Sequence, residues 1–260
     1  MFFNTFKSEW TKLTTTKGIW WNLFFYFLLV VGFLLPNIYD LKSRNRDFTS
    51  QGLPAMPLDP GVINSMAAQG GGLILMILAI LVVTTEYGHK YAPMTFQAVP
   101  RRWNVAIAKL LLMSLIAIVL TVISIGIALV MYRFIAGADA LNGLNFDNKD
   151  FVRMLWIGPF YTVMLVLLAQ GVAWLVRNSA GSIVIMLVWY MVLEVMVIPM
   201  IPKLGEKIHP YGPLSNLGAF FHNQDLANTP WDVTGSLIYF LAWAVGIYAV
   251  GLVLLYRRDA

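Results

Sequence analysis

Few side chains of this sequence have the type and spacing that catalysis or metal binding requires. The three histidines, His89, His209 and His222, fall in polar connecting stretches, and a catalytic zinc site needs three ligands brought together. The sequence has no cysteine and no H-E-x-x-H, G-x-S-x-G or G-x-x-x-x-G-K-[ST] pattern. We therefore expect that the chain is not an enzyme and that it holds no metal, cofactor or nucleotide of its own.

Ionisable side chains inside apolar runs are the next candidates, because a charge is costly to bury in hydrocarbon. Glu194 lies well inside the run 181–201. It either lines a substrate path or a seam between subunits, or it is satisfied by water or by a neighbouring helix. Ion-coupled transport generally needs more than one such group near the bilayer centre, which disfavours that class. Lys109 and Arg153 stand near the ends of apolar runs, where we expect their side chains to extend toward water.

The elements that must position these residues are membrane helices. Hydrophobic residues make up 59% of the 260 residues and charged residues 12%, against about 45–50% and about 25% in ordinary soluble domains. A crossing helix needs about 20 apolar residues, whereas a membrane barrel has alternating segments of about ten. The sequence predicts an all-α integral membrane protein whose transmembrane domain, residues 19–256, has six helices: 19–39, 64–84, 105–135, 154–176, 181–201 and 234–256. We expect the first of them to be a span and not a cleaved signal, since its apolar run is longer than 7–15 residues.

Lys and Arg residues predict the orientation, because they collect at the cytoplasmic ends of spans. With both termini in the cytoplasm, ten basic residues lie inside and eight outside, and three of the ten precede the first span. The inner connection is then 85–104, the outer ones include 202–233, and 257–260 is a cytoplasmic tail. The basic residues are scattered, so we expect no nucleic-acid partner.

Residues 1–18 have the pattern of an amphipathic helix that lies in the membrane interface. One face carries the large apolar side chains, and the other face is predicted to carry Lys7, Glu9 and Lys12. The apolar side chains are those of Phe2, Phe3, Phe6, Trp10 and Leu13. Such a helix either only contacts membrane lipid or also meets a cytoplasmic partner.

The inner segment 85–104 carries more aromatic residues than a simple connection needs. It begins with Glu86 and Tyr87, continues through Tyr91 and Phe96, and ends on Pro100-Arg101-Arg102. The aromatic side chains either form a docking surface or lie in the headgroup region.

Pairs of small residues four apart predict close helix packing. Ala242 and Gly246 form one pair in the sixth span, and Ala67 and Gly71 form another in the second. They lie either at a seam between two subunits or between helices of one subunit.

Three short motifs in this order resemble a known family. They are Ser8-Glu9-Trp10-Thr11-Lys12-Leu13 before a Trp-Trp first span, Glu86-Tyr87 with Thr95, Val99-Pro100-Arg101-Arg102 and Lys109, and the ending Tyr256-Arg257-Arg258-Asp259-Ala260. With the number and order of spans, they are similar to the six-span permease subunits of bacterial ATP-binding-cassette (ABC) exporters of the type-two permease family.

The resemblance implies partners and roles that the residues alone do not give. Family members pair as two permease copies, or as two close relatives, with separate ATPase subunits that bind ATP and Mg. It implies a coupling helix in 85–104, an interfacial elbow helix in 1–18, short re-entrant helices in 202–233, and a location in the bacterial plasma membrane. The substrate expected for apolar spans is amphipathic, drug-like or lipidic. The alternative is a membrane assembly or immunity factor that transports nothing.

Overall fold

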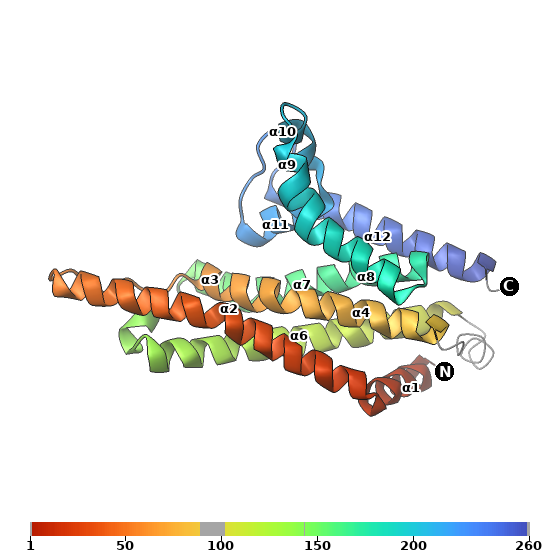
Figure 1. The fold of residues 1–260 in the computed structure, drawn as a ribbon, viewed down its shortest axis with the longest axis horizontal. Coiled ribbons are helices and arrows are strands. Elements are labelled where there is room, and N and C mark those ends of the chain that lie inside the picture. The colour runs from red at the N-terminus through yellow and green to blue at the C-terminus, as the bar shows by residue number, and fades with distance from the viewer. Residues whose placement is uncertain (1, 89–101, 143, 259–260) are drawn as a thin grey trace. The chain divides into compact units, whose positions relative to one another are not determined.

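A computed structural model describes residues 2–88, 102–142 and 144–258, and these residues are helical throughout apart from short connections, with no strand among them. The elements are α1 (Phe2–Thr15), α2 (Lys17–Ser50), α3 (Pro60–Asn64), η1 (Ser65–Gly70), α4 (Gly71–Gly88), α6 (Arg102–Ile135), η2 (Ala138–Leu141), α7 (Lys149–Val176), α8 (Ser179–Leu187), η3 (Val188–Val197), α9 (Ile198–Met200), α10 (Gly205–Ile208), η4 (His209–Tyr211), α11 (Pro213–His222) and α12 (Val233–Arg258) (Figure 1). Of these, η1 and η3 are π-helical and η2 and η4 are 3₁₀ helices.

All six predicted spans lie in helices that are long and apolar enough to cross a membrane. They are Lys17–Ser50, Pro60–Gly88, Trp103–Ile135, Lys149–Val176, Ser179–Met200 and Val233–Arg257. The all-α membrane architecture expected from the sequence is therefore confirmed at this level. The predicted outer connection 202–233 contains the short helices α10, η4 and α11.

The first span differs from the prediction at its C-terminal end. Residues 40–50 continue α2, although the sequence predicted that the first helix ends at 39. This stretch has no Gly or Pro, and Arg44 pairs with Asp40 one turn earlier on the same helix. The helix ends just before Gly52, whose φ of 75° closes it with a left-handed turn.

The chain divides into two compact units, to which α4, α6 and α7 each contribute residues. One unit comprises residues 17–75 and 115–162. Its centre is Tyr26 of α2, whose hydroxyl accepts a hydrogen bond of 3.0 Å from Ser124 of α6. A Cβ at Gly71 would overlap the Tyr26 ring, so the small residue allows this contact.

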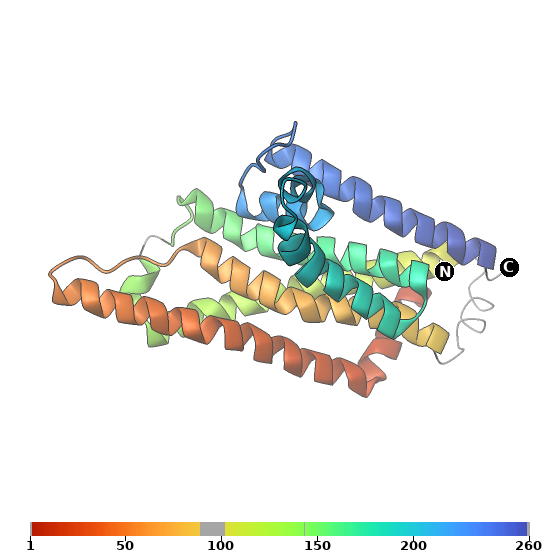
Figure 2. The same ribbon diagram turned by 45° about the horizontal axis from the view of Figure 1, so that its top comes forward.

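The other unit comprises residues 1–16, 76–114 and 163–260. Glycines bring α7 and α12 together here: a Cβ at Gly251 would lie 2.7 Å from Trp174 Cβ, and one at Gly171 would lie 3.0 Å from the Tyr248 backbone nitrogen. Helix α11 lies along α12, as both views show (Figures 1 and 2).

Several helix termini meet at one end of this second unit. The hydroxyls of Thr84 near the end of α4 and Ser179 at the start of α8 are 2.7 Å apart. Arg177, just after α7, donates a hydrogen bond of 2.9 Å to the carbonyl of Leu254 near the end of α12. Figures 1 and 2 show α1 at the same end. The end of α4 therefore lies beside the start of α8, and the end of α7 lies beside the end of α12.

Candidate functional site

Helix α1 presents a polar residue at the centre of its buried face. Its buried side chains are Thr5, Glu9 and Leu13, spaced four apart and therefore on one side of the helix. Phe3 and Trp10 are exposed. The sequence prediction that Glu9 lies on a solvated polar face is wrong, because its side chain is only 3% exposed.

Lys109 of α6 is the cation opposite Glu9. Its ammonium nitrogen lies 2.5 Å from Glu9 Oε2, 3.2 Å from Glu86 Oε1 and 3.0 Å from the carbonyl oxygen of Val82 in α4. These three acceptors match the three N–H donors of an ammonium group. The side chain is 2% exposed, so the expectation that Lys109 extends to water is wrong.

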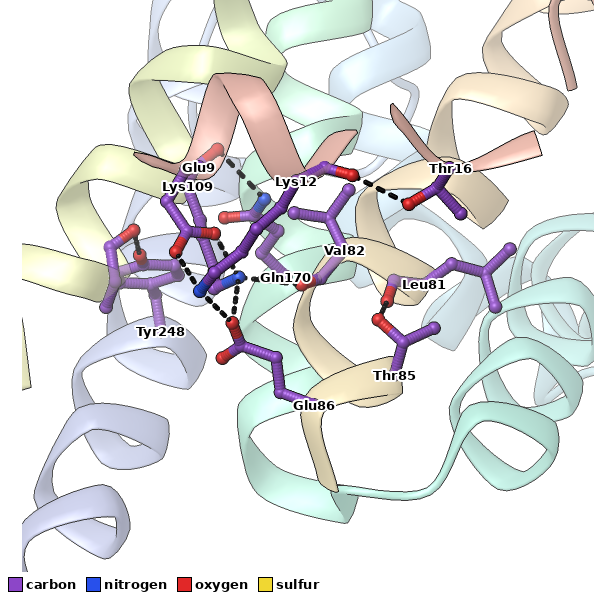
Figure 3. Close-up of polar contacts among 11 residues, drawn as sticks. Glu9, Lys12, Thr16, Leu81, Val82, Thr85, Glu86, Lys109, Gln170 and Tyr248 are labelled. Carbon is purple, nitrogen blue, oxygen red and sulfur yellow. Dashed lines mark hydrogen bonds and ion pairs between the residues drawn. The ribbon is translucent and has the colours of Figure 1, made fainter. Parts of the chain in front are cut away.

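Lys12, one turn after Glu9, completes a closed cluster of alternating charges. Its Nζ lies 2.7 Å from Glu9 Oε1 and 2.8 Å from Glu86 Oε1. Figure 3 shows both lysines between the two carboxylates, which come from α1 and from the last turn of α4. With two acidic and two basic members, the charge cluster of Glu9, Lys12, Glu86 and Lys109 is neutral overall.

The pKa values of the two α1 residues reflect these contacts. Burial alone would raise the pKa of Glu9, but the charge of Lys109 and hydrogen bonds from Lys109 and Lys12 outweigh it and lower that pKa. Burial alone would lower the pKa of Lys12, but Glu86 and Glu9 outweigh it and raise that pKa. Both residues are therefore charged at neutral pH.

Two buried side chains hold the first turns of α6 beside the cluster. Gln170 of α7 donates a hydrogen bond of 3.3 Å to the backbone carbonyl of Lys109, and the Tyr248 hydroxyl of α12 donates one of 2.9 Å to the carbonyl of Ala106 (Figure 3). The position of Lys109 is thus fixed through its backbone as well as through its side chain.

This arrangement suits mechanical linkage better than bond chemistry. Both ammonium groups of the cluster are engaged by the carboxylates of Glu9 and Glu86. Among the described residues, no group of three His, Cys, Asp or Glu side chains could hold a metal ion. The cluster ties the N-terminal helix to the two helix ends that flank the inner segment.

Glu86 joins this cluster, and its neighbour Tyr87 packs elsewhere. The Tyr87 ring meets Trp174 of α7 edge to face, with ring centroids 6.3 Å apart, and the Arg177 guanidinium lies 5.0 Å from its centroid. In this structure Tyr87 therefore contacts its own chain.

The other predicted coupling and interfacial residues are placed as follows. Arg102 is the first residue of α6. On α1, Phe2 and Phe6 are half-buried and Trp10 is exposed. Three predicted coupling residues lie outside the described residues: Tyr91, Phe96 and Arg101.

Glu194 lies in the π-helical η3 and binds the start of α11. Its carboxylate accepts hydrogen bonds from the backbone nitrogens of Leu214 and Ser215, at 3.3 and 2.7 Å, and from the Ser215 hydroxyl, at 2.9 Å. The Trp189 indole donates a fourth. The carboxylate satisfies free N–H groups in the first turn of α11, so Glu194 fastens α11 to η3.

The two pairs of small residues have different surroundings. Ala67 is buried and Gly71 meets Tyr26, so this pair packs helices within the chain. Ala242 and Gly246 line an open apolar groove between α12 and Leu175. A Cβ at Gly246 would have no atom of the described residues within 4 Å, so this position is free to face lipid or a second chain.

Three cluster residues, Glu9, Lys12 and Lys109, were not predicted as a site, although the sequence holds a signal for Glu9 and Lys109. Glu9 stands on the helical stripe of Phe2, Phe6 and Leu13, which marks it as buried. Lys109 is a basic residue within the apolar run 105–135, which calls for an acidic partner.

Comparison with known proteins adds no family to these observations, since the chain matches no protein-family model and no curated protein.

Proposed function

We propose that this chain is the membrane-spanning permease subunit of a bacterial ABC exporter. It moves an amphipathic, drug-like or lipidic substrate across the plasma membrane with ATP hydrolysed by a separate subunit. Both termini lie in the cytoplasm, and 85–104 is the segment that contacts the ATPase.

The observation that carries this proposal is the charge cluster. A chain without a nucleotide motif of its own can be driven by ATP only through contacts with another subunit that differ between states. Such contacts need a firm connection between the contacting segment and the spans. Glu86 lies at the start of the inner segment and Lys109 lies shortly after its end, and both are tied to α1, Lys109 through Glu9 and Glu86 through Lys12.

The test of transport needs a phosphate-loop ATPase partner, which this proposal expects an adjacent reading frame to encode. The two proteins are co-expressed, inside-out vesicles are prepared, and ATP-dependent accumulation of a fluorescent amphipathic cation and of a fluorescent phospholipid is measured. The matched control is the same pair with an ATPase that binds but does not hydrolyse ATP. We expect accumulation of at least one probe only with the active ATPase.

A stable complex with no ATP-dependent movement of either probe would contradict the exporter proposal. It would favour the alternative, an assembly or immunity factor. Absence of any complex with the ATPase would contradict the proposal more directly.

The orientation is tested separately, and the lack of cysteine makes the test clean. Single cysteines replace the exposed residues Ser50, Gln224 and Ser8. In intact cells, an impermeant maleimide should label Ser50→Cys and Gln224→Cys, and should label Ser8→Cys only after the membrane is opened. Protection of Ser50→Cys or Gln224→Cys in intact cells would overturn the orientation.

A further inference from the structure

The four members of the charge cluster are not held equally. Glu9 and Lys109 are 2.5 Å apart, and their side chains are 3% and 2% exposed. Glu86 lies farther from Lys109, at 3.2 Å, and its side chain is 9% exposed. Its second oxygen, Oε2, has no hydrogen-bond partner among the described residues. Of the two carboxylates, Glu86 is therefore bound less firmly than Glu9.

The consequences of losing each carboxylate also differ. If Glu86 moves away, Lys109 keeps Glu9 and the Val82 carbonyl, and the Lys12 side chain, 44% exposed, can be hydrated. If Glu9 moves away, a buried ammonium loses its closest acceptor. A buried charge left without its partner is far more costly than an exposed one.

The backbone just before Glu86 has a feature that favours bending. The hydroxyls of Thr84 and Thr85 bond back to the carbonyls of Ile80 and Leu81, at 2.9 and 2.7 Å (Figure 3 shows the second bond). Threonine side chains that bond to the carbonyl four residues earlier slightly weaken a helix and often bend it. Lys109 holds the preceding turn of α4 through the carbonyl of Val82. The position where α4 can flex thus lies between Val82 and Glu86.

We propose that Glu86 is a releasable latch. Glu9 and Lys109 form the permanent contact between α1 and α6. The last turn of α4, residues 85–88, switches between a closed state, with Glu86 on the two lysines, and an open state, with Glu86 in water. This inference builds on the proposed function, in which the turn is the start of the ATPase-contacting segment 85–104, so that ATPase movement would open and close the latch.

The first test needs no ATPase. Spin labels are attached to the double variant Ser8→Cys with Gly88→Cys, in the otherwise cysteine-free chain. Both sites are exposed, and a Cβ at Gly88 has no atom of the described residues within 4 Å. The distance distribution between the labels is compared in the unaltered, Glu86→Gln and Glu9→Gln backgrounds. We expect Glu86→Gln to broaden the distribution toward longer distances.

Thermal stability in detergent distinguishes a latch from a structural pair. Glu86→Gln should shift the melting temperature by no more than about 2–4 °C in a chain of this size, because Lys12, 44% exposed, can be hydrated and Lys109 keeps Glu9. Glu9→Gln should lower it by about 6 °C or more. A Glu86→Gln distribution that matches the unaltered one, or a loss of stability as large as for Glu9→Gln, would overturn the latch.

The second test uses the complex and separates the two proposals. If the latch serves coupling, trapping the ATPase with vanadate should shift the label distances of the unaltered chain toward those of Glu86→Gln. Glu86→Gln should also retain ATP hydrolysis while transport per ATP falls. If vanadate leaves the distances unchanged although Glu86→Gln broadens them in the isolated chain, the latch itself stands and its link to ATP hydrolysis is refuted.

Discussion

Removing the buried cation from the charge cluster should cost the chain much of its stability. Lys109→Met replaces the ammonium by an apolar group of similar length and leaves Glu9 and Glu86 to share Lys12. Both carboxylates are at least nine-tenths buried, at 3% and 8% exposed. Breaking a buried pair from one side typically costs about 3–5 kcal/mol. We expect about 3 kcal/mol, the lower end, because Lys12 remains within 2.8 Å of each carboxylate.

The double variant gives the decisive comparison. Replacing both members of a buried pair by apolar residues is often neutral or stabilising, because both desolvation costs disappear together. Lys109→Met combined with Glu9→Met should therefore be more stable than Lys109→Met alone, with a coupling energy on the order of 2 kcal/mol. The assay is denaturant or thermal unfolding of the purified chain in detergent, followed by tryptophan fluorescence.

An exposed ion pair provides the matched control. Arg44 and Asp40 pair across one turn of α2, with side chains 58% and 53% exposed. Arg44→Met should change the unfolding free energy by about 0.5 kcal/mol or less. Additive effects of Lys109→Met and Glu9→Met, or a Lys109→Met effect as small as that of Arg44→Met, would refute the burial and closeness on which the candidate site depends.

Three further predictions follow. Because the pKa of Glu9 is lowered, its contribution to stability is present above the ordinary value of 4.5 and is lost as pH falls below it. Because the pKa of Lys12 is raised, its contribution to stability is present below the ordinary value of 10.5 and is lost as pH rises above it. The melting temperature of the unaltered chain should fall at both extremes, and a Glu9→Gln variant should lack the part of the acid loss that Glu9 causes. On α12, Gly251→Ala should destabilise the chain through steric overlap with α7, whereas Gly246→Ala should be neutral or stabilise it by up to about 1 kcal/mol, measured by the same unfolding assay. Glu194→Ala should release α11 and increase amide hydrogen exchange in its first turns, while exchange in α1 stays unchanged. If α11 exchanges at the same rate in Glu194→Ala and in the unaltered chain, the capping role is contradicted.

The spans were predictable because each depends only on its own composition. About 20 apolar residues in a row suffice to identify a membrane helix, whatever it packs against. The charge cluster was not predictable in this way, because the burial of Glu9 depends on a partner 100 residues away. A single polar residue on an apolar stripe was interpreted as part of the polar face, and the pairing of Lys109 with α1 could not be read from local spacing.

Other parts of the chain show the same limit. The length of α2 depends on the Arg44–Asp40 ion pair and on Gly52, and these residues lie beyond the apolar run from which the span was predicted. The sequence marks Glu194 as an ionisable group inside an apolar run, but two of its hydrogen-bond partners are backbone N–H groups of α11, which no side-chain pattern reveals. The two pairs of small residues have the same spacing, Ala67 with Gly71 and Ala242 with Gly246. Only the structure distinguishes the packed pair from the open one.

The separation of Glu9 from Lys109 also has a consequence for biosynthesis. At roughly 5–20 residues per second, Lys109 is made about 5–20 s after Glu9. During that interval the first two spans are synthesised while α1 has no buried counter-ion and its carboxylate stays hydrated. When the third span is made, the waiting carboxylate supplies the counter-charge that lets an ammonium remain in an apolar helix. A chain that lacks residues 2–15 would leave Lys109 without this counter-charge, and we expect it to insert less efficiently.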